Sequence, residues 1–177
     1  MLIRQLNSNE LQMLRSVLGR SVPKVYAPNL AVCRLWYAAP HFSLPLGGEF
    51  LVVESDWADT RKEAIDYHTM RVSIADHPRD IPKVFDKAGR KMIGSPVSTV
   101  EIGEPKSEIV SVTVLERQKT GREEAVKYDS GLVFTLADGR RFALGTRESI
   151  AGGLECSTDS ACIDELLAED GVRQILS

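Results

Sequence analysis

Apolar and polar residues alternate most regularly between residues 109 and 146, and this pattern predicts three consecutive antiparallel strands. The first strand, 109–115, has valines at every second position, as expected of a strand with one buried face. The second has apolar residues at even positions from Val126 to Leu136, and the third carries Phe142 and Leu144. Polar links that contain glycine separate the strands. We therefore predict a C-terminal β-meander over this part of the chain.

The turn between the last two strands determines their register. A two-residue loop at 138–139 would place Phe142 opposite Thr135, whereas a three-residue loop at 137–139 pairs it with Phe134. Only the longer loop keeps the large apolar side chains on one face, because a slip of one residue turns every side chain to the other face. A type I turn followed by a left-handed glycine is typical of such loops. We expect the three-residue loop.

Helices are predicted near both ends of the chain. The first begins with Asn7, followed three residues later by Glu10, which matches a capping box, and its leucines recur at helical spacing over 8–18. The second, 159–170, follows residues that can cap a helix and carries an apolar stripe. A glycine ends it, and the apolar residues of 172–176 predict one further helical turn.

Between the first helix and the meander, the pattern is less regular. Apolar runs at 30–37, 50–53, 68–74 and 97–102 predict further strands. The first of these runs is apolar on both faces, which is typical of a central strand covered on both sides. The segment 75–96 is interrupted by Pro and Gly, has no sustained period, and is predicted to be a long irregular loop.

Together these elements predict an α+β fold. It consists of a mainly antiparallel, curved β-sheet of about six or seven strands, with the C-terminal meander at 109–146. The N-terminal helix 8–18 and the C-terminal helix 159–170 pack on this sheet. A chain of 177 residues fits a single globular domain, 1–177, that contains the irregular loop 75–96.

Composition narrows the class of protein. The chain is 43% hydrophobic and 27% charged, as in ordinary globular proteins. It lacks an apolar run of membrane-spanning length and a signal-peptide pattern at its start, so we expect a soluble cytoplasmic protein that does not enter a membrane. Three cysteines without a C-x-x-C spacing are predicted to be reduced thiols.

Charge is distributed unevenly along the chain. The net charge is −3 overall, but residues 148–177 carry seven acids against one base, a net −6, which leaves residues 1–147 at +3. An acidic C-terminal part and a net negative charge argue against general nucleic-acid binding.

One set of residues could form a metal or acid/base site. It comprises Glu54, Asp56, His68 and His77. No pair among them has the spacing of a known ligand motif, and three histidines in the chain offer little to build a site from. His68 falls on the apolar face of its predicted strand, so a buried structural histidine is the favoured interpretation. We predict no metal and no cofactor.

Each cysteine could also act as a nucleophile if a base or a helix N-terminus activated it. Cys33 lies in an apolar run and Cys162 on the apolar stripe of the second helix. Cys156, just before that helix, is the best remaining candidate. Burial without chemistry is the favoured interpretation for all three, because free cysteine is among the most buried residue types.

Charged segments supply the remaining candidates for binding. The loop 75–96 carries five bases, and the second helix carries three exposed acids; these residues are Arg79, Lys83, Lys87, Arg90, Lys91, Asp164, Glu165 and Glu169. A basic loop can grip an anion or an acidic partner, and an acidic helix can steer a basic one. Solvation of a charged surface is the alternative for both.

Without a nucleotide-binding or nucleophile-elbow pattern, three classes of function remain. The first is a non-catalytic protein-binding or accessory domain, of the inhibitor or immunity type. This class is suggested by the general type of the domain and not by a sequence motif. It would bind another protein through the acidic helix or the 75–96 loop. The second is a small-molecule-binding domain, and the third is an enzyme with a scattered site near the two histidines. Whether the chain forms a homo-oligomer is left open.

Overall fold

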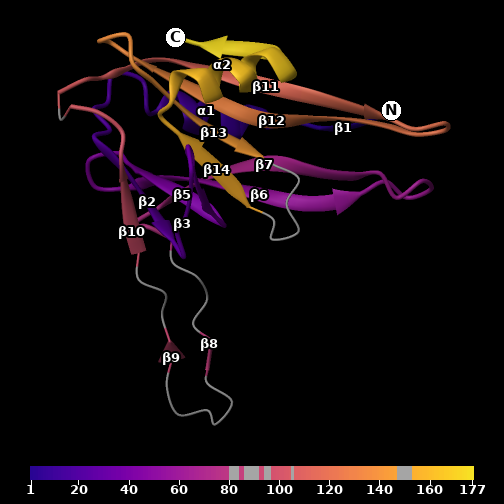
Figure 1. The fold of residues 1–177 in the computed structure, drawn as a ribbon, viewed down its shortest axis with the longest axis horizontal. Helices are drawn as coiled ribbons and strands as arrows, with labels where there is room; N and C mark the ends of the chain where they lie inside the picture. The colour runs from indigo at the N-terminus through magenta and orange to yellow at the C-terminus, as the bar shows by residue number, and fades with distance from the viewer. Residues whose placement is uncertain (80–83, 86–91, 94–96, 105, 147–152) are drawn as a thin grey trace.

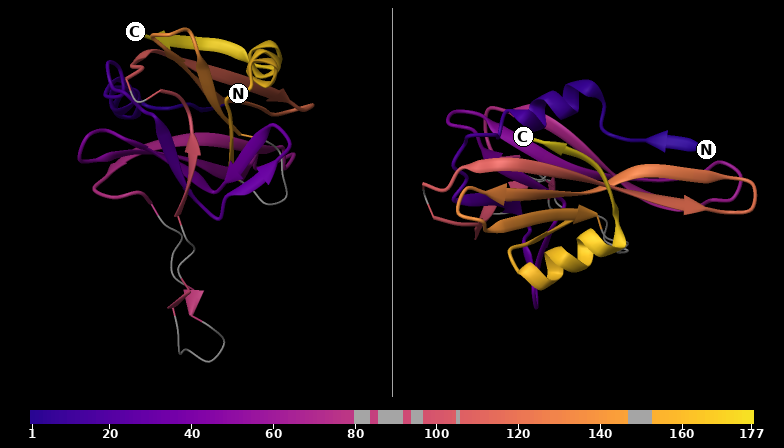
Figure 2. Two further views of the ribbon diagram at one scale, coloured as in Figure 1. Left: turned by 60° about the vertical axis from the view of Figure 1, so that its left-hand side comes forward. Right: turned by 90° about the horizontal axis from the view of Figure 1, so that it is seen from above.

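Two β-sheets lie face to face, with one helix beside them and one on the outer face of the larger sheet (Figures 1 and 2). The computed structural model describes residues 1–79, 84–85, 92–93, 97–104, 106–146 and 153–177. Antiparallel ladders make up most of the described fold, with a helix near each end of the chain, so the predicted α+β class is confirmed. The strands are divided between two sheets, however, and are more numerous than the six or seven predicted.

The larger sheet has eight strands among the described residues, and all its ladders are antiparallel except that of β1 with β12. Across the sheet the strands run β15 (Gly171–Leu176), β11 (Ile109–Thr120), β12 (Ala125–Leu136), β13 (Arg141–Thr146), β14 (Leu154–Ser157), β4 (Trp36–Ala39) and β3 (Ala31–Cys33), with β1 (Leu2–Arg4) beside the start of β12.

The smaller sheet has five antiparallel strands. They run in the order β10 (Val97–Glu101), β2 (Lys24–Pro28), β5 (His41–Pro45), β6 (Phe50–Asp59) and β7 (Asp66–Ala75). Within the segment predicted to be irregular, β8 (Val84–Phe85) pairs with β9 (Met92–Ile93).

The main core lies between the sheets, where apolar residues from both inner faces are fully buried. Phe134 and Phe142 of the meander stack there with ring centroids 4.4 Å apart. They are cross-strand partners, as the three-residue loop predicts. Gly139 adopts a φ of +85°, so the left-handed turn glycine is also confirmed.

The first helix, α1 (Ser8–Arg15), closes one side of the molecule (Figure 2). The predicted capping box is present: Asn7 caps the helix, and the Glu10 carboxylate accepts the Asn7 N–H at 2.9 Å. The same carboxylate accepts the N–H of Val72 at 3.3 Å, on the edge strand β7. Glu10 therefore covers a strand edge that would otherwise be open to pairing.

The second helix, α2 (Ser160–Glu169), lies on the outer face of the larger sheet. Asp159 is its N-cap, and the apolar stripe predicted for it packs on β11, β12 and β13. The chain then continues at once into β15, so the predicted extra helical turn at 172–176 is wrong.

The strand predicted at 30–37 is also wrong. This apolar run forms two short strands, β3 and β4, joined by a turn at Arg34 and Leu35. β3 is an exposed edge of the larger sheet rather than a covered central strand. Of the apolar residues in this run only Trp36 is buried, whereas Val32 and Leu35 are exposed.

Two β-bulges lie side by side in the larger sheet. The neighbour β12 has one extra residue, Ser130, opposite Leu115 and Glu116 of β11, and the neighbour β15 has one extra residue, Arg173, opposite Val114 and Leu115. A bulge changes the direction of the side chains around it. Consecutive residues Asp129 and Ser130 are consequently both buried.

Candidate functional site

The residues of the predicted acid/base site do not converge. Glu54 and Asp56 share one face of β6, while His68 pairs with Trp57 and so projects from the opposite face of the β6–β7 ladder. Asp56 forms an ion pair with Arg71 at 3.1 Å. No group of three or more metal-binding side chains is found within the described ranges.

The three cysteines occupy different environments. Cys156 is buried, and burial raises the pKa of its thiol to about 12, so the thiolate is disfavoured at neutral pH. Cys162 is buried on α2, as predicted. Cys33 is exposed on β3, which corrects the prediction that it is buried.

Of the five predicted basic residues of the loop, the structure describes one, Arg79. Its guanidinium forms an ion pair with Glu54, and its carbonyl lies 2.7 Å from the imidazole Nε2 of His41. These contacts hold the start of the loop to the smaller sheet. Lys83, Lys87, Arg90 and Lys91 lie outside the described residues.

The acids of α2 divide into three kinds. Asp164 and Glu169 face solvent and form ion pairs with Arg141 and Arg117, respectively, at 2.8 and 3.6 Å. Glu165 is exposed and has no ion pair among the described residues. Asp170, which follows the helix, is buried.

The buried acids belong to a charged cluster at the two bulges. Asp170 accepts hydrogen bonds from Nε of Arg117 and from the hydroxyl of Ser130, both at 2.6 Å. Asp129, also buried, lies 2.8 Å from two nitrogens of Arg173. These pairs give the acids and bases around residue 170 a structural role.

The Asp129 carboxylate also accepts a hydrogen bond from the backbone N–H of Leu6 at 2.7 Å. Burial nevertheless raises its pKa to about 6, against the lowering effects of that hydrogen bond and of Arg173. One carboxylate thus joins the N-terminal segment to the C-terminal strand.

An exposed apolar strip lies on β15, the edge strand of the larger sheet. Val172 is 53% exposed and Ile175 is 60% exposed. Val172 pairs with Leu115 and Ile175 pairs with Thr113. Because Leu115 and Thr113 are two residues apart on β11, the side chains of Val172 and Ile175 project from the same face of the sheet. The bulge at Arg173 places these two residues, three apart in sequence, side by side. Among the described residues, β15 has no second strand neighbour.

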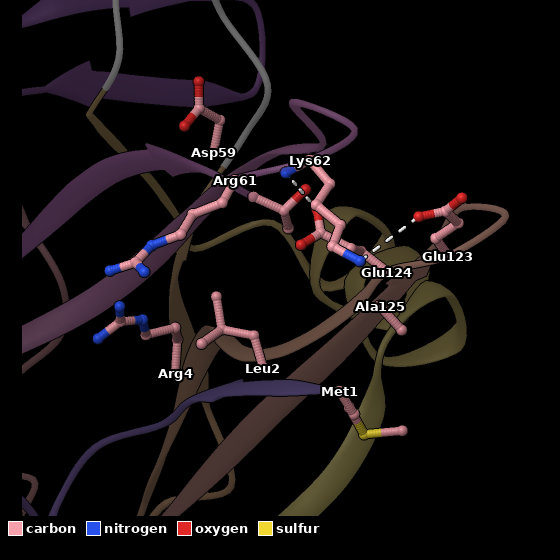
Figure 3. Close-up of a pocket in the computed structure, with 10 residues that line it drawn as sticks. Met1, Leu2, Arg4, Asp59, Arg61, Lys62, Glu123, Glu124 and Ala125 are labelled. Atoms are coloured by element: carbon pink, nitrogen blue, oxygen red, sulfur yellow. Dashed lines mark hydrogen bonds and ion pairs between the residues drawn. The ribbon is translucent and has the colours of Figure 1, made fainter.

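A pocket of about 470 Å³ lies at the other end of the molecule, between the tips of the β6–β7 and β11–β12 hairpins and β1 (Figure 3). Two carboxylates hold the tips together. Glu63 accepts the backbone N–H groups of residues 122–124 at 2.8–2.9 Å. Glu124 in turn accepts those of Lys62 and Glu63 at 2.8 and 3.1 Å. The backbone hydrogen bonds lower the pKa of the Glu63 carboxyl, and a hydrogen bond from the Thr60 side chain, together with the two backbone N–H groups, lowers that of Glu124.

Two arginines are the prominent cations of this pocket. Arg4 extends from β1 and Arg61 from the β6–β7 tip; both line the pocket, and both guanidinium groups point to the same side in the view of Figure 3. Both side chains are exposed, and neither forms an ion pair or a hydrogen bond with another described residue. Leu2 and Ala125 provide apolar lining.

Sequence reasoning missed both of these surfaces. The two arginines are far apart in sequence and carry no motif, and a parallel strand and a hairpin tip bring them together. The β15 strip did leave a signal, the apolar residues of 172–176, but its spacing resembles that of a helix.

Comparison of the chain with protein-family models, with curated proteins and with solved structures found no match. Among the described residues, no helix is long and apolar enough to cross a membrane. The site geometry therefore carries the functional argument.

Proposed function

We propose that this protein is a non-catalytic protein-binding domain that takes up an extended segment of another protein along β15. The observation that carries the proposal is the exposed apolar strip, Val172 and Ile175, on an edge strand of the larger sheet. An edge strand presents backbone N–H and C=O groups that a partner strand can pair with. Side chains at alternate positions of that partner would then cover the strip.

The backbone of β15 supports this mode of binding. Apart from its ladder with β11, the strand forms no backbone hydrogen bond with the other described residues. The other long edge differs, because Glu10 of α1 already accepts a backbone N–H of β7. β15 also follows directly from α2 and is anchored by Arg173 and by Asp170, so it would be presented in a fixed conformation.

Charge indicates the chemistry of the partner. α2 contains no basic residue, and its exposed acids Asp164, Glu165 and Glu169 lie on the helix that precedes the strip. An apolar segment that also carries lysine or arginine would satisfy both features, with the acids increasing its association rate. Glu165 contributes most to the negative potential beside the strip, because Arg141 and Arg117 partly neutralise Asp164 and Glu169.

A pair of synthetic peptides tests the proposal. In one peptide valine alternates with lysine, and in the other valine alternates with glutamate. We expect the lysine peptide to bind and to slow amide hydrogen exchange along β15, measured by NMR. Ile175→Lys should abolish this protection, because it replaces an apolar contact with a like charge. Val32→Lys is the matched control, since Val32 is an exposed residue on the opposite edge strand, β3.

The alternatives give different results. If the glutamate peptide bound equally well, the charge argument would be wrong. Protection that survives Ile175→Lys, or that Val32→Lys also removes, would contradict docking on β15. Sedimentation of the protein alone tests a second copy as the occupant: self-association that Ile175→Lys abolishes would replace the proposed partner by another copy of this chain.

A further inference from the structure

We propose that the pocket at the hairpin tips is a binding site for a phosphate monoester, recognised by Arg4 and Arg61. This site is separate from the β15 strip and does not depend on the proposed function. Three features of the pocket support this assignment: the anchored backbones of the two arginines, their unneutralised charges, and the size and lining of the pocket.

The backbones that carry the arginines are anchored on both sides. β1 pairs in parallel with β12, which places Arg4 beside Tyr128, and the Arg4 carbonyl accepts the Thr69 hydroxyl at 2.7 Å from β7. Arg61 lies between Thr60 and Lys62, and the Lys62 N–H is held by Glu124. The backbone positions of both arginines are therefore fixed before a ligand binds, and binding would order only the two side chains.

The acids of the pocket are engaged elsewhere. Glu124 accepts two backbone N–H groups, and Glu123 forms its ion pair with Lys62 at 3.5 Å. The Asp59 carboxylate points away from the two guanidinium groups in Figure 3. Arg4 and Arg61 thus line one pocket without a compensating anion in the described part of the chain. Two like charges in one pocket repel, and an anion bound between them removes that repulsion.

The charge and shape of the site indicate a phosphate monoester rather than a simple carboxylate. A phosphate monoester carries about −1.5 to −2 charges at neutral pH, which matches two guanidinium groups. Arginine binds phosphate through parallel N–H···O bonds. The pocket volume of about 470 Å³ is in the range of small-molecule sites, and Leu2 and Ala125 offer apolar contact for the group that the phosphate esterifies.

Calorimetric titration with phenyl phosphate tests the site, with inorganic phosphate and benzoate as comparison ligands. We expect phenyl phosphate to bind more tightly than either, because it alone supplies both the dianion and an apolar group. Arg4→Gln and Arg61→Gln should each weaken binding by about tenfold or more, the loss expected for hydrogen bonds to a charged group. Arg61→Lys should also weaken it, since lysine keeps the charge but loses the paired geometry.

Arg122→Gln is the matched control. Arg122 is an exposed arginine at the β11–β12 tip, near the pocket but not lining it. If this variant weakened binding as much as Arg61→Gln, the effect would be general electrostatics and the site would be disproved. Failure of phenyl phosphate to bind, or benzoate binding as tightly, would also overturn the proposal. Unchanged thermal midpoints would show that the four variants remain folded.

Discussion

The pH dependence of stability should contain a large contribution from one buried carboxyl, Asp129. In the folded protein, burial raises its pKa to about 6, from 3.8 for an exposed aspartate. Between about pH 4 and pH 6 the folded state therefore holds a proton that the unfolded state has lost. A folded state that binds more protons loses stability as the pH rises. The contribution of Asp129 is thus most favourable below pH 4 and is lost as the pH rises through 6.

The size of the effect follows from the same two values. At about 1.36 kcal/mol for each factor of ten in acidity, their difference corresponds to at most about 3 kcal/mol. Asp129→Asn removes the titration and leaves an amide oxygen that can still accept the Leu6 N–H. The neutral amide cannot form the ion pair with Arg173, which the wild-type protein also loses when Asp129 is protonated. Only the difference between the amide and the protonated carboxyl adds an offset that does not depend on pH.

Urea unfolding of both proteins between pH 4 and pH 7 measures the effect. All other groups titrate in both proteins, so they cancel in the difference between the two stability curves. We expect the variant to gain up to about 3 kcal/mol relative to wild type as the pH rises from 4 to 7. Parallel curves across this range would refute the reasoning, because they would mean that Asp129 titrates alike in the folded and unfolded chains.

Two further predictions concern a contact within the larger sheet and a contact between the two sheets. Asp170→Ala should reduce the free energy of unfolding by about 3 kcal/mol or more, because it leaves Arg117 half-buried without its main partner. Asp164→Ala, which removes an exposed ion pair, should change it by less than about 1 kcal/mol. Equal losses in urea unfolding would contradict this prediction. Gly121→Ala should speed amide hydrogen exchange at residues 122–124 without lowering the thermal midpoint greatly. The reason is that the new Cβ would overlap the Glu63 carboxylate, which accepts hydrogen bonds from those amides. Unchanged exchange would show that the two hairpin tips are held in another way.

The parts of the fold that could be predicted are those in which local sequence and tertiary structure agree. The register of Phe134 with Phe142 follows from alternation and from a glycine able to adopt positive φ. The capping box at Asn7 is equally local, since its two hydrogen bonds join residues three apart. Such features depend on nothing beyond their neighbours in sequence, so one chain is enough to predict them.

The parts that could not be predicted depend on sheet topology. The bulge at Arg173 spaces Val172 and Ile175 three residues apart on one face of a strand, which is the spacing of a helical stripe. The spacing of apolar residues in 172–176 therefore predicts a helical turn where the structure has a strand. The run at 30–37 was misassigned because a short apolar run does not distinguish one covered strand from an edge hairpin.

The candidate pocket depends even more on contacts distant in sequence. Arg4 reaches it because β1 pairs in parallel with β12, and Arg61 reaches it because Glu63 and Glu124 join two hairpin tips. Glu63 and Glu124, which each accept backbone N–H groups of the other hairpin tip, form no recognisable sequence pattern, since glutamates in polar turns are common. Only the paired tips show that these acids are structural and that the nearby arginines form no ion pair with another described residue.

The position of Asp129 connects the two proposed binding surfaces. Its carboxylate accepts the N–H of Leu6, two residues after Arg4 of the pocket, and pairs with Arg173 of β15, the strand that carries the apolar strip. Both ends of the chain are thus held by one buried group, at the bulges of the larger sheet. Protonation of Asp129 removes the charge that both contacts use. A ligand that binds the charged form of this arrangement more tightly would therefore lower the pKa of Asp129, and by linkage its affinity would fall as the pH drops through 6.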